Sequence, residues 1–217
     1  MPAFTPLSIE YKALSTHSPS GVYVLPTPSA PLLWSGVIFI RAGPYKNAIF
    51  RFKMDLQRYG EGEGKNCYPK VKFISKVWHP MVGGGGDVDL EAFFPEWEKK
   101  STSLVTVLTY LKKMFYMSEF NNDVCMLVGN QEALELFNND TSDGKANFVS
   151  EVEKCVDESQ LKMYENEDGS ALIFTEHSEA HEVLKSLLVA PTAGGTETTA
   201  MKKLVGVIEA TTGEKNV

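Results

Sequence analysis

Cysteines are few, long apolar runs are missing, and each absence excludes a class of protein. The three cysteines include no Cys-x-x-Cys pair, which excludes a disulfide framework and a cysteine-based zinc site and fits a reducing cytosol. The longest apolar run, Val37–Ile40, has the length of a strand and falls far short of the ~18 residues of a membrane helix. The first residues have neither the charged start nor the apolar stretch of a signal peptide. We therefore expect a cytoplasmic protein that does not insert into membranes.

Positive charge is also scarce. The chain has 21 basic and 28 acidic residues among 217, a formal net charge of −7. A nucleic-acid-binding protein normally carries a basic patch, so this balance argues against that class. Apolar residues make up 43% of the chain, which is enough for one sizeable core with an additional tail.

A short helix and then strands are predicted for the first half of the chain. Leu7, Tyr11 and Leu14 share one helical face within residues 6–17. Ile49–Leu56 shows the clearest strand signal, because large apolar side chains alternate there with charged ones. The strands expected are 21–25, 32–41, 49–56 and 71–74. Since only short connections join most of them, they indicate a four-stranded antiparallel meander.

The second half changes to a helical period. Six apolar residues lie on one face of a predicted helix: Leu104, Val107, Leu108, Leu111, Met114 and Phe115. Further helices are expected over 132–137 and 148–162, the latter with Phe148, Val152 and Cys155 on one stripe. Strands followed by helices indicate an α+β domain over residues 1–160.

The remainder divides into an extension over 161–190 and a flexible or weakly helical tail over 191–217. The extension contains a short apolar run, Ala171–Phe174, which reads as a strand, and then an amphipathic helix. The apolar stripe of that helix consists of Ala180, Val183, Leu184, Leu187 and Leu188. Such a stripe either packs on its own domain or meets a partner helix, and we treat it as a candidate partner surface.

An ordered series of motifs resembles the ubiquitin-conjugating enzyme family. The motifs are Trp34-Ser35-Gly36, Gly43-Pro44-Tyr45, Phe50 with Phe52, Pro69, His79-Pro80-Met81 and Asn130-Gln131-Glu132-Ala133. The resemblance covers roughly residues 7–160. It is strongest to the non-catalytic Fused Toes or AKT-interacting protein branch, which the extension around Ala171–Leu188 also matches. The resemblance implies the fold of that family: an N-terminal helix, the meander and C-terminal helices.

The resemblance also identifies two losses of catalytic chemistry. Counted from His79, the family's cysteine position is residue 89, which is Asp89, while Gly86, Leu90 and Trp97 keep the family spacing. An aspartate cannot form the thioester that a thiolate forms. Met81 stands where the family has an asparagine that stabilises an oxyanion, and a thioether donates no hydrogen bond. We predict a protein that is not an enzyme, with no catalytic residue.

The cysteines and the acids near His79 suggest two alternative kinds of site. Cys67 could in principle act as a nucleophile, but no base neighbours it; Cys125 and Cys155 are expected to pack or to be incidental. A metal site could combine His79 with the acids Asp87, Asp89 and Glu91. The competing interpretation is a backbone-bonded histidine near solvated acids, and we predict neither metal nor cofactor.

The four glycines 83–86 lack the following Gly-Lys-Ser/Thr of a phosphate loop. We interpret them as a flexible part of the turn.

The expected partners are inferred from the family resemblance alone. Fused Toes proteins belong to an adaptor complex with Hook-type coiled-coil proteins that links vesicles to dynein, so the first expectation is an adaptor with such a partner. The alternative is an accessory subunit that pairs with an active ubiquitin-conjugating enzyme and positions acceptor ubiquitin.

Overall fold

The computed structural model describes residues 4–59, 68–90, 94, 103–118, 129–166, 170–182 and 185. The chain forms two compact units, Met1–Phe174 and Thr175–Val217. In the second unit, residues 179–182 and 185 are helical. The fold described below is that of the first unit.

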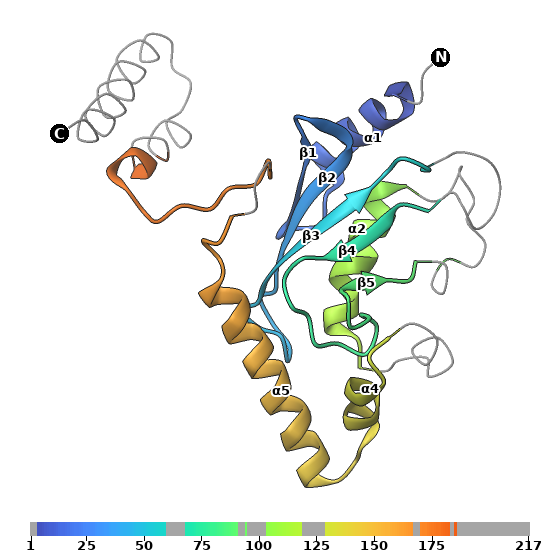
Figure 1. Ribbon diagram of the computed structural model, residues 1–217, viewed down its shortest axis with the longest axis vertical. Helices are drawn as coiled ribbons and strands as arrows, with labels where there is room; N and C mark the ends of the chain where they lie inside the picture. Colours follow the sequence, from blue (N-terminus) through green and yellow to red (C-terminus); the bar gives the residue numbers. More distant parts are fainter. Residues whose placement is uncertain are drawn as a thin grey trace. The chain divides into compact units, whose positions relative to one another are not determined.

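A five-stranded antiparallel sheet forms the centre of the first unit (Figure 1). Its strands follow chain order: β1 (Val22–Thr27), β2 (Ala30–Phe39), β3 (Ile49–Asp55), β4 (Lys70–Phe73) and β5 (Asp87–Val88). The expected meander is confirmed, but the expected number of strands is wrong, because β5 adds a fifth. This strand is too short to produce a readable period in the sequence, and its pairing with Val71 and Lys72 of β4 defines it.

The alternation in β3 sets the two faces of the sheet. Phe50, Phe52 and Met54 are buried on the inner face, whereas the residues between them are half-buried on the outer face. Phe52 pairs with Gly36 of β2, and a Cβ atom at Gly36 would lie 2.2 Å from Cζ of the Phe52 ring. The glycine of the Trp-x-Gly motif is therefore required by packing, since only a residue without a side chain leaves room for this ring.

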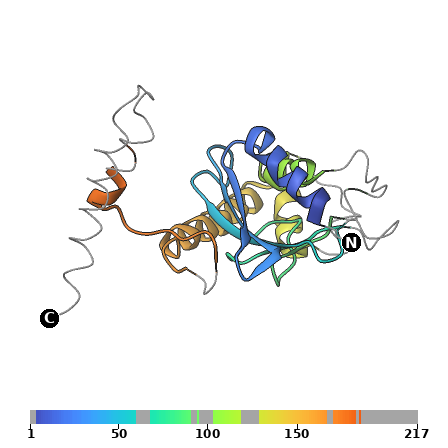
Figure 2. The same cartoon turned by 90° about the horizontal axis from the view of Figure 1, so that it is seen from above.

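Two neighbouring helices cover the inner face of the sheet. α1 (Phe4–His17) lies beside α2 (Leu104–Lys113), which continues into the 3₁₀ turn η1 (Met114–Tyr116) (Figures 1 and 2). The Ser103 side chain caps α2, and a carboxylate oxygen of Glu10 from α1 accepts the Leu104 amide at 2.7 Å. All six apolar residues expected on the face of this helix are buried, which confirms that prediction.

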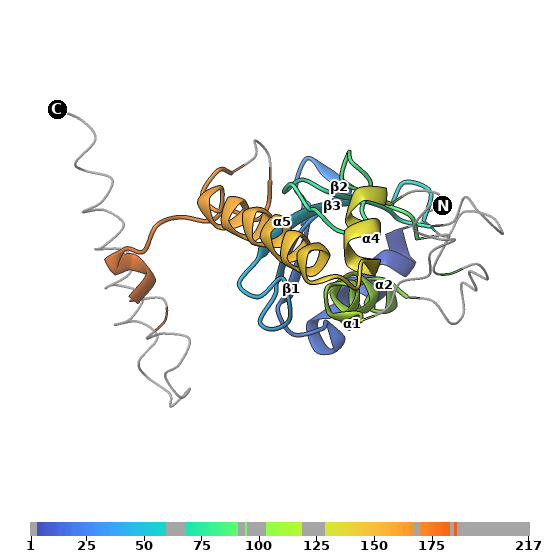
Figure 3. The same ribbon diagram turned by 90° about the horizontal axis from the view of Figure 1, so that it is seen from below.

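The last two helices of the unit pack against each other. α4 (Gln131–Asn138) begins at the Asn130 cap, and α5 (Ser142–Leu161) begins at the Thr141 cap (Figure 3). Phe148, Val152 and Cys155 of α5 are buried on one stripe, as the spacing predicts. α5 starts six residues earlier than the apolar stripe indicates, since its first turn contains mainly polar residues.

The chain then folds back over the outer face of the sheet, and we call residues 170–174 the strap. Arg51 of β3 donates to the carbonyl oxygens of Met163 (2.6 Å) and Glu165 (3.2 Å), and to Oδ1 of Asn166 (2.9 Å). The Asn166 side chain in turn bonds both backbone groups of Phe174, at 2.8 and 2.9 Å. The first compact unit therefore extends to Phe174, beyond the boundary that the sequence placed at residue 160.

The apolar run Ala171–Phe174 forms no strand, so the strand expected in the extension is wrong. Its backbone pairs with the side-chain amide of Asn166 instead of with a neighbouring strand. Within the described part of the chain, no helix has the length and apolar character to cross a membrane.

Candidate functional site

His79 is the most enclosed polar side chain near the site. Its exposed fraction is 0%, and its ring lies 5.4 Å from the Tyr45 ring and 5.2 Å from the Phe115 ring. Nδ1 accepts the Met81 amide at 3.0 Å, so the proton resides on Nε2, which donates to the Met114 carbonyl at 3.1 Å. Burial lowers the pKa of His79 from 6.5 to about 3. The neutral histidine thus connects the turn after β4 to η1 through two hydrogen bonds to backbone groups, as the backbone-bonding interpretation predicts.

Met81 is a packing residue. Its side chain has an exposed fraction of 5%, and its sulfur accepts the Tyr110 hydroxyl of α2 at 3.9 Å. Next to it, the Pro80 carbonyl accepts the Asn130 amide at the start of α4 (3.2 Å). The Oδ1 atom of Asn130 is committed to capping the Ala133 amide at 3.1 Å. The His-Pro turn is thereby held between α2 and α4.

Asp89 follows β5 directly and lies half-buried, between buried Val88 and Leu90. The preceding turn is closed by backbone bonds from Gly86 N to Gly83 O (2.8 Å) and from Gly83 N to Asp87 O (3.0 Å). No cysteine occurs between residues 68 and 90. A carboxylate, and no thiol, therefore follows β5 at the position that the resemblance assigns to the nucleophile.

Gly86 is conformationally restricted. The interpretation of residues 83–86 as a flexible part of the turn is therefore wrong for Gly86. Its φ is +87°, and its carbonyl accepts the Phe73 amide at 2.8 Å. A Cβ atom there would lie 2.2 Å from the Phe73 carbonyl oxygen. The glycine allows the turn to pass directly against β4.

The acids of this turn do not gather around His79. Asp87 is exposed and lies 4.0 Å from the Lys72 ammonium, while both ring nitrogens of His79 serve backbone groups. Glu91 lies outside the described residues. In the part of the chain that the structure describes, no group of three His, Cys, Asp or Glu side chains could hold a metal ion.

Of the cysteines, only Cys155 lies among the described residues. Its buried sulfur lies between α5 and the segment that follows β4. The sulfur accepts from the Trp78 amide and donates to the Lys76 carbonyl, both at 3.3 Å. Burial is the main cause that raises the pKa of this thiol to about 11. The predicted packing role is confirmed, since a thiol with so high a pKa is inert near neutral pH. Cys67 and Cys125 lie outside the described residues.

The predicted partner helix is only partly described. Ala180 is half-buried on a helical segment that starts at Glu179. The remaining residues of its stripe (Val183, Leu184, Leu187 and Leu188) lie outside the part described, side chains included. The role of this stripe as a partner surface stays a prediction.

The sequence reasoning missed Arg51 and Asn166, which attach the strap to the outer face of the sheet. Arg51 reads in the sequence as one polar residue of the alternating strand, and its partners follow more than 110 positions later. A guanidinium on the wet face of a central strand was the available signal. It indicates a polar contact above the sheet but cannot name the partner.

Comparison with known proteins is consistent with this geometry. The family model for ubiquitin-conjugating enzymes matches residues 6–155. A Culex quinquefasciatus protein named "Protein crossbronx homolog" is 33% identical over 175 residues, covering 79% of this chain and 73% of that protein. The Nematostella vectensis "Protein AKTIP homolog" is 33% identical over 172 residues, 78% of this chain and 54% of the relative.

A mammalian relative extends the comparison. The Mus musculus "AKT-interacting protein" is 30% identical over 196 residues, 83% of this chain and 63% of the relative. The chain thus spans somewhat more than half the length of the sea anemone and mouse proteins, and most of the length of the mosquito protein.

Proposed function

The chain belongs to the ubiquitin-conjugating enzyme family, as a variant in the group of AKT-interacting (Fused Toes) and crossbronx proteins, and from this premise we propose that it is catalytically inactive and serves as an adaptor subunit in the cytoplasm. The observation that carries the proposal is a pair of replacements, one in the His-Pro turn and one directly after β5. Asp89 stands at the nucleophile position, and buried Met81 stands at the position of the oxyanion asparagine.

Each replacement removes a different requirement of acyl transfer. The reaction needs a sulfur that accepts ubiquitin and later leaves, and a carboxylate cannot do both. It also needs a donor for the oxyanion, and losing one such donor typically lowers the rate by ~10²–10³. Because the two losses are independent, neither residue compensates for the other. The described thiol, Cys155, is buried and has a raised pKa, which supports the same conclusion.

A fold without its nucleophile works through its surfaces. The relatives named AKT-interacting protein are named for a protein partner. For this chain we propose a Hook-type coiled-coil protein as the partner, in dynein-linked vesicle transport, as the resemblance to Fused Toes proteins implies. Neither nucleic acid nor a metal ion enters this function.

Affinity purification of the full chain from its native cells tests the adaptor function. We expect a coiled-coil protein to co-purify at a stoichiometric level and to survive a salt wash, because an apolar interface weakens little with ionic strength. An unrelated cytosolic protein with the same tag is the control. Recovery of no coiled-coil protein would contradict the proposal.

The alternative, an accessory subunit for an active ubiquitin-conjugating enzyme, rests on family membership and gives a different result in the same experiment. An active conjugating enzyme would then co-purify, and the purified chain would bind free ubiquitin. We favour the adaptor because the group to which the relatives belong is named for another protein partner.

A further inference from the structure

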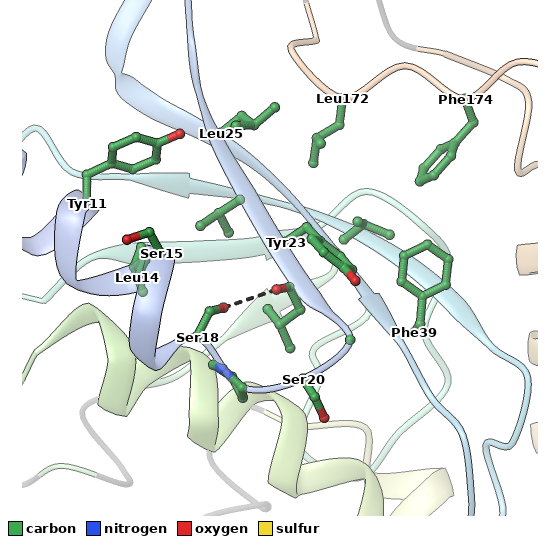
Figure 4. A pocket seen from close by; sticks show the side chains of 15 residues that line it. Tyr11, Leu14, Ser15, Ser18, Ser20, Tyr23, Leu25, Phe39, Leu172 and Phe174 are labelled. Carbon is green, nitrogen blue, oxygen red and sulfur yellow. Dashed lines mark hydrogen bonds between the residues drawn. The ribbon is translucent and has the colours of Figure 1, made fainter. Parts of the chain in front are cut away.

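A groove of about 680 Å³ runs around β1, between the C-terminal half of α1 and the strap (Figure 4). Tyr11 lines it from α1, Leu172 and Phe174 line it from the strap, and Tyr23 projects between them. None of the residues that line it is an Asp, Glu, Lys or Arg, although 23% of the chain is charged. An open, uncharged groove offers a small polar ligand no charged group to bind.

Several large side chains in this groove face solvent. The exposed fractions are 54% for Tyr23, 38% for Tyr11 and 37% for Leu25. Exposed large apolar side chains that gather in one concave place mark interaction sites more often than the same side chains scattered singly. The groove therefore fits an apolar protein surface.

A strand is a poor occupant, because the free edge of β1 is already blocked. The Gly21 carbonyl accepts the Phe39 amide at 2.8 Å, so by the alternation of an antiparallel ladder Val22 and Val24 turn their backbone groups to the outer edge. The Val22 amide donates to the Pro19 carbonyl (3.0 Å), and the Ser18 hydroxyl donates to the Val22 carbonyl (3.1 Å; dashed in Figure 4). Pro26 has no amide proton. The edge between these positions is too short for strand addition.

The strap shows how apolar side chains occupy this surface. Leu172 and Phe174 line the groove while Ile173, between them, is 65% exposed. The Phe174 ring meets Phe39 edge-on at 6.1 Å, and the Arg51 guanidinium lies 4.8 Å from the centre of the Phe174 ring. One wall of the groove is thus a defined structure held by Arg51.

Two lysines neighbour residues that line the groove. Lys12 is exposed on α1 next to Tyr11, and the Lys112 ammonium lies 2.6 Å from the carbonyl oxygen of Ser20, a lining residue. In a chain of net charge −7, cations beside an apolar groove favour a partner with acidic borders.

We propose that this groove binds an amphipathic helix of the partner protein, with an uncharged stripe of Leu and Phe side chains bordered by acidic residues. This inference rests on the proposed function, because it names the surface through which the adaptor holds its coiled-coil partner. A helix satisfies its own backbone hydrogen bonds, so it needs only side-chain contacts from the groove.

The direct test measures binding of a synthetic amphipathic peptide, with a Leu/Phe stripe bordered by glutamates, to the full chain by fluorescence anisotropy. Tyr23→Ser should weaken binding by about 30-fold, the effect typical of a buried aromatic anchor, and Phe174→Ser should weaken it similarly. Ile173→Ser, in the same strap but facing solvent, is the matched control and should leave the affinity unchanged. Lys12→Glu should weaken binding at low salt, and a peptide with lysine borders should bind that variant better than the wild type.

Equal affinity of the wild type and Tyr23→Ser, or no binding of the peptide to the wild type, would overturn the proposal. So would a dimer of the chain that Tyr23→Ser dissociates, because the groove would then hold a second copy. Co-purification separates this inference from the adaptor function. A coiled-coil partner retained equally by Tyr23→Ser refutes the groove alone, whereas peptide binding to a chain that captures no coiled-coil protein refutes the adaptor function alone.

Discussion

Replacing Gly86 with alanine should lower the free energy of unfolding by about 3 kcal/mol or more. An alanine at a φ of +87° is strained, and the added Cβ atom would lie 2.2 Å from the Phe73 carbonyl oxygen. Left-handed backbone costs a residue with a side chain ~1–2 kcal/mol, and moving β4 away from the turn adds the loss of the Phe73–Gly86 hydrogen bond. Urea unfolding followed by circular dichroism measures the difference.

Gly84 provides the matched control within the same run of glycines. A Cβ atom at Gly84 has no neighbour within 4 Å, so Gly84→Ala should leave stability unchanged or raise it by ~0.4–1 kcal/mol through the unfolded state. If the two variants unfold at the same urea concentration, the restricted geometry assigned to Gly86 is incorrect.

Lowering the pH should destabilise the protein through His79 well before the folded histidine takes up a proton. The pKa of His79 is lowered by burial from 6.5 to about 3, so between these values the unfolded chain binds a proton that the folded chain does not. Stability therefore rises with pH across this window, and the contribution of His79 is fully present above pH 6.5. As the pH falls below 6.5, the loss reaches up to about 1.4 kcal/mol for each unit.

Urea unfolding of the wild type and His79→Asn between pH 7 and pH 4 isolates this contribution. The variant should be less stable at pH 7, since the Met81 amide and the Met114 carbonyl lose their partner, but its stability should fall less steeply with acid. His17→Gln, at an exposed position, is the matched control for the loss of a histidine. A ring titration near pH 6.5 for His79, measured by NMR in the folded chain, would contradict the assignment.

The sequence predicted the elements in which the apolar pattern repeats several times. The alternation of Phe50, Phe52 and Met54 fixed the inner face of β3, and the stripe of Phe148, Val152 and Cys155 fixed the buried face of α5. The sequence did not predict β5, because a strand of two residues is too short to show an alternating pattern. The strand is defined by its pairing with β4. The early start of α5 escaped prediction because Thr141 and its polar first turn give a cap signal without an apolar stripe.

The candidate site likewise has a part that the sequence predicted and a part that it did not. The order of motifs located the His-Pro turn, and the packing of His79 agrees with its predicted backbone role. The constraint on Gly86 could not be read from the sequence, because a run of four glycines looks uniformly flexible. It depends on how closely β4 passes.

The strap was not predicted for a related reason. The apolar residues of Ala171–Phe174 suggested a strand, whereas their position depends on contacts with Arg51 and Asn166 that local patterns do not reveal. The groove follows from the same long-range contacts, since the strap supplies one of its walls.

A thioester-loading assay with activating enzyme, ATP and ubiquitin tests the central claim, the absence of conjugating activity, most directly. An active ubiquitin-conjugating enzyme in a parallel reaction shows that the reagents work, and Asp89→Asn shows that any signal is independent of this carboxylate. We expect the wild-type chain to form no adduct with ubiquitin on a non-reducing gel, because Asp89 and Met81 replace the two groups that the reaction needs. A ubiquitin adduct on the wild-type chain that disappears on reduction would contradict the account.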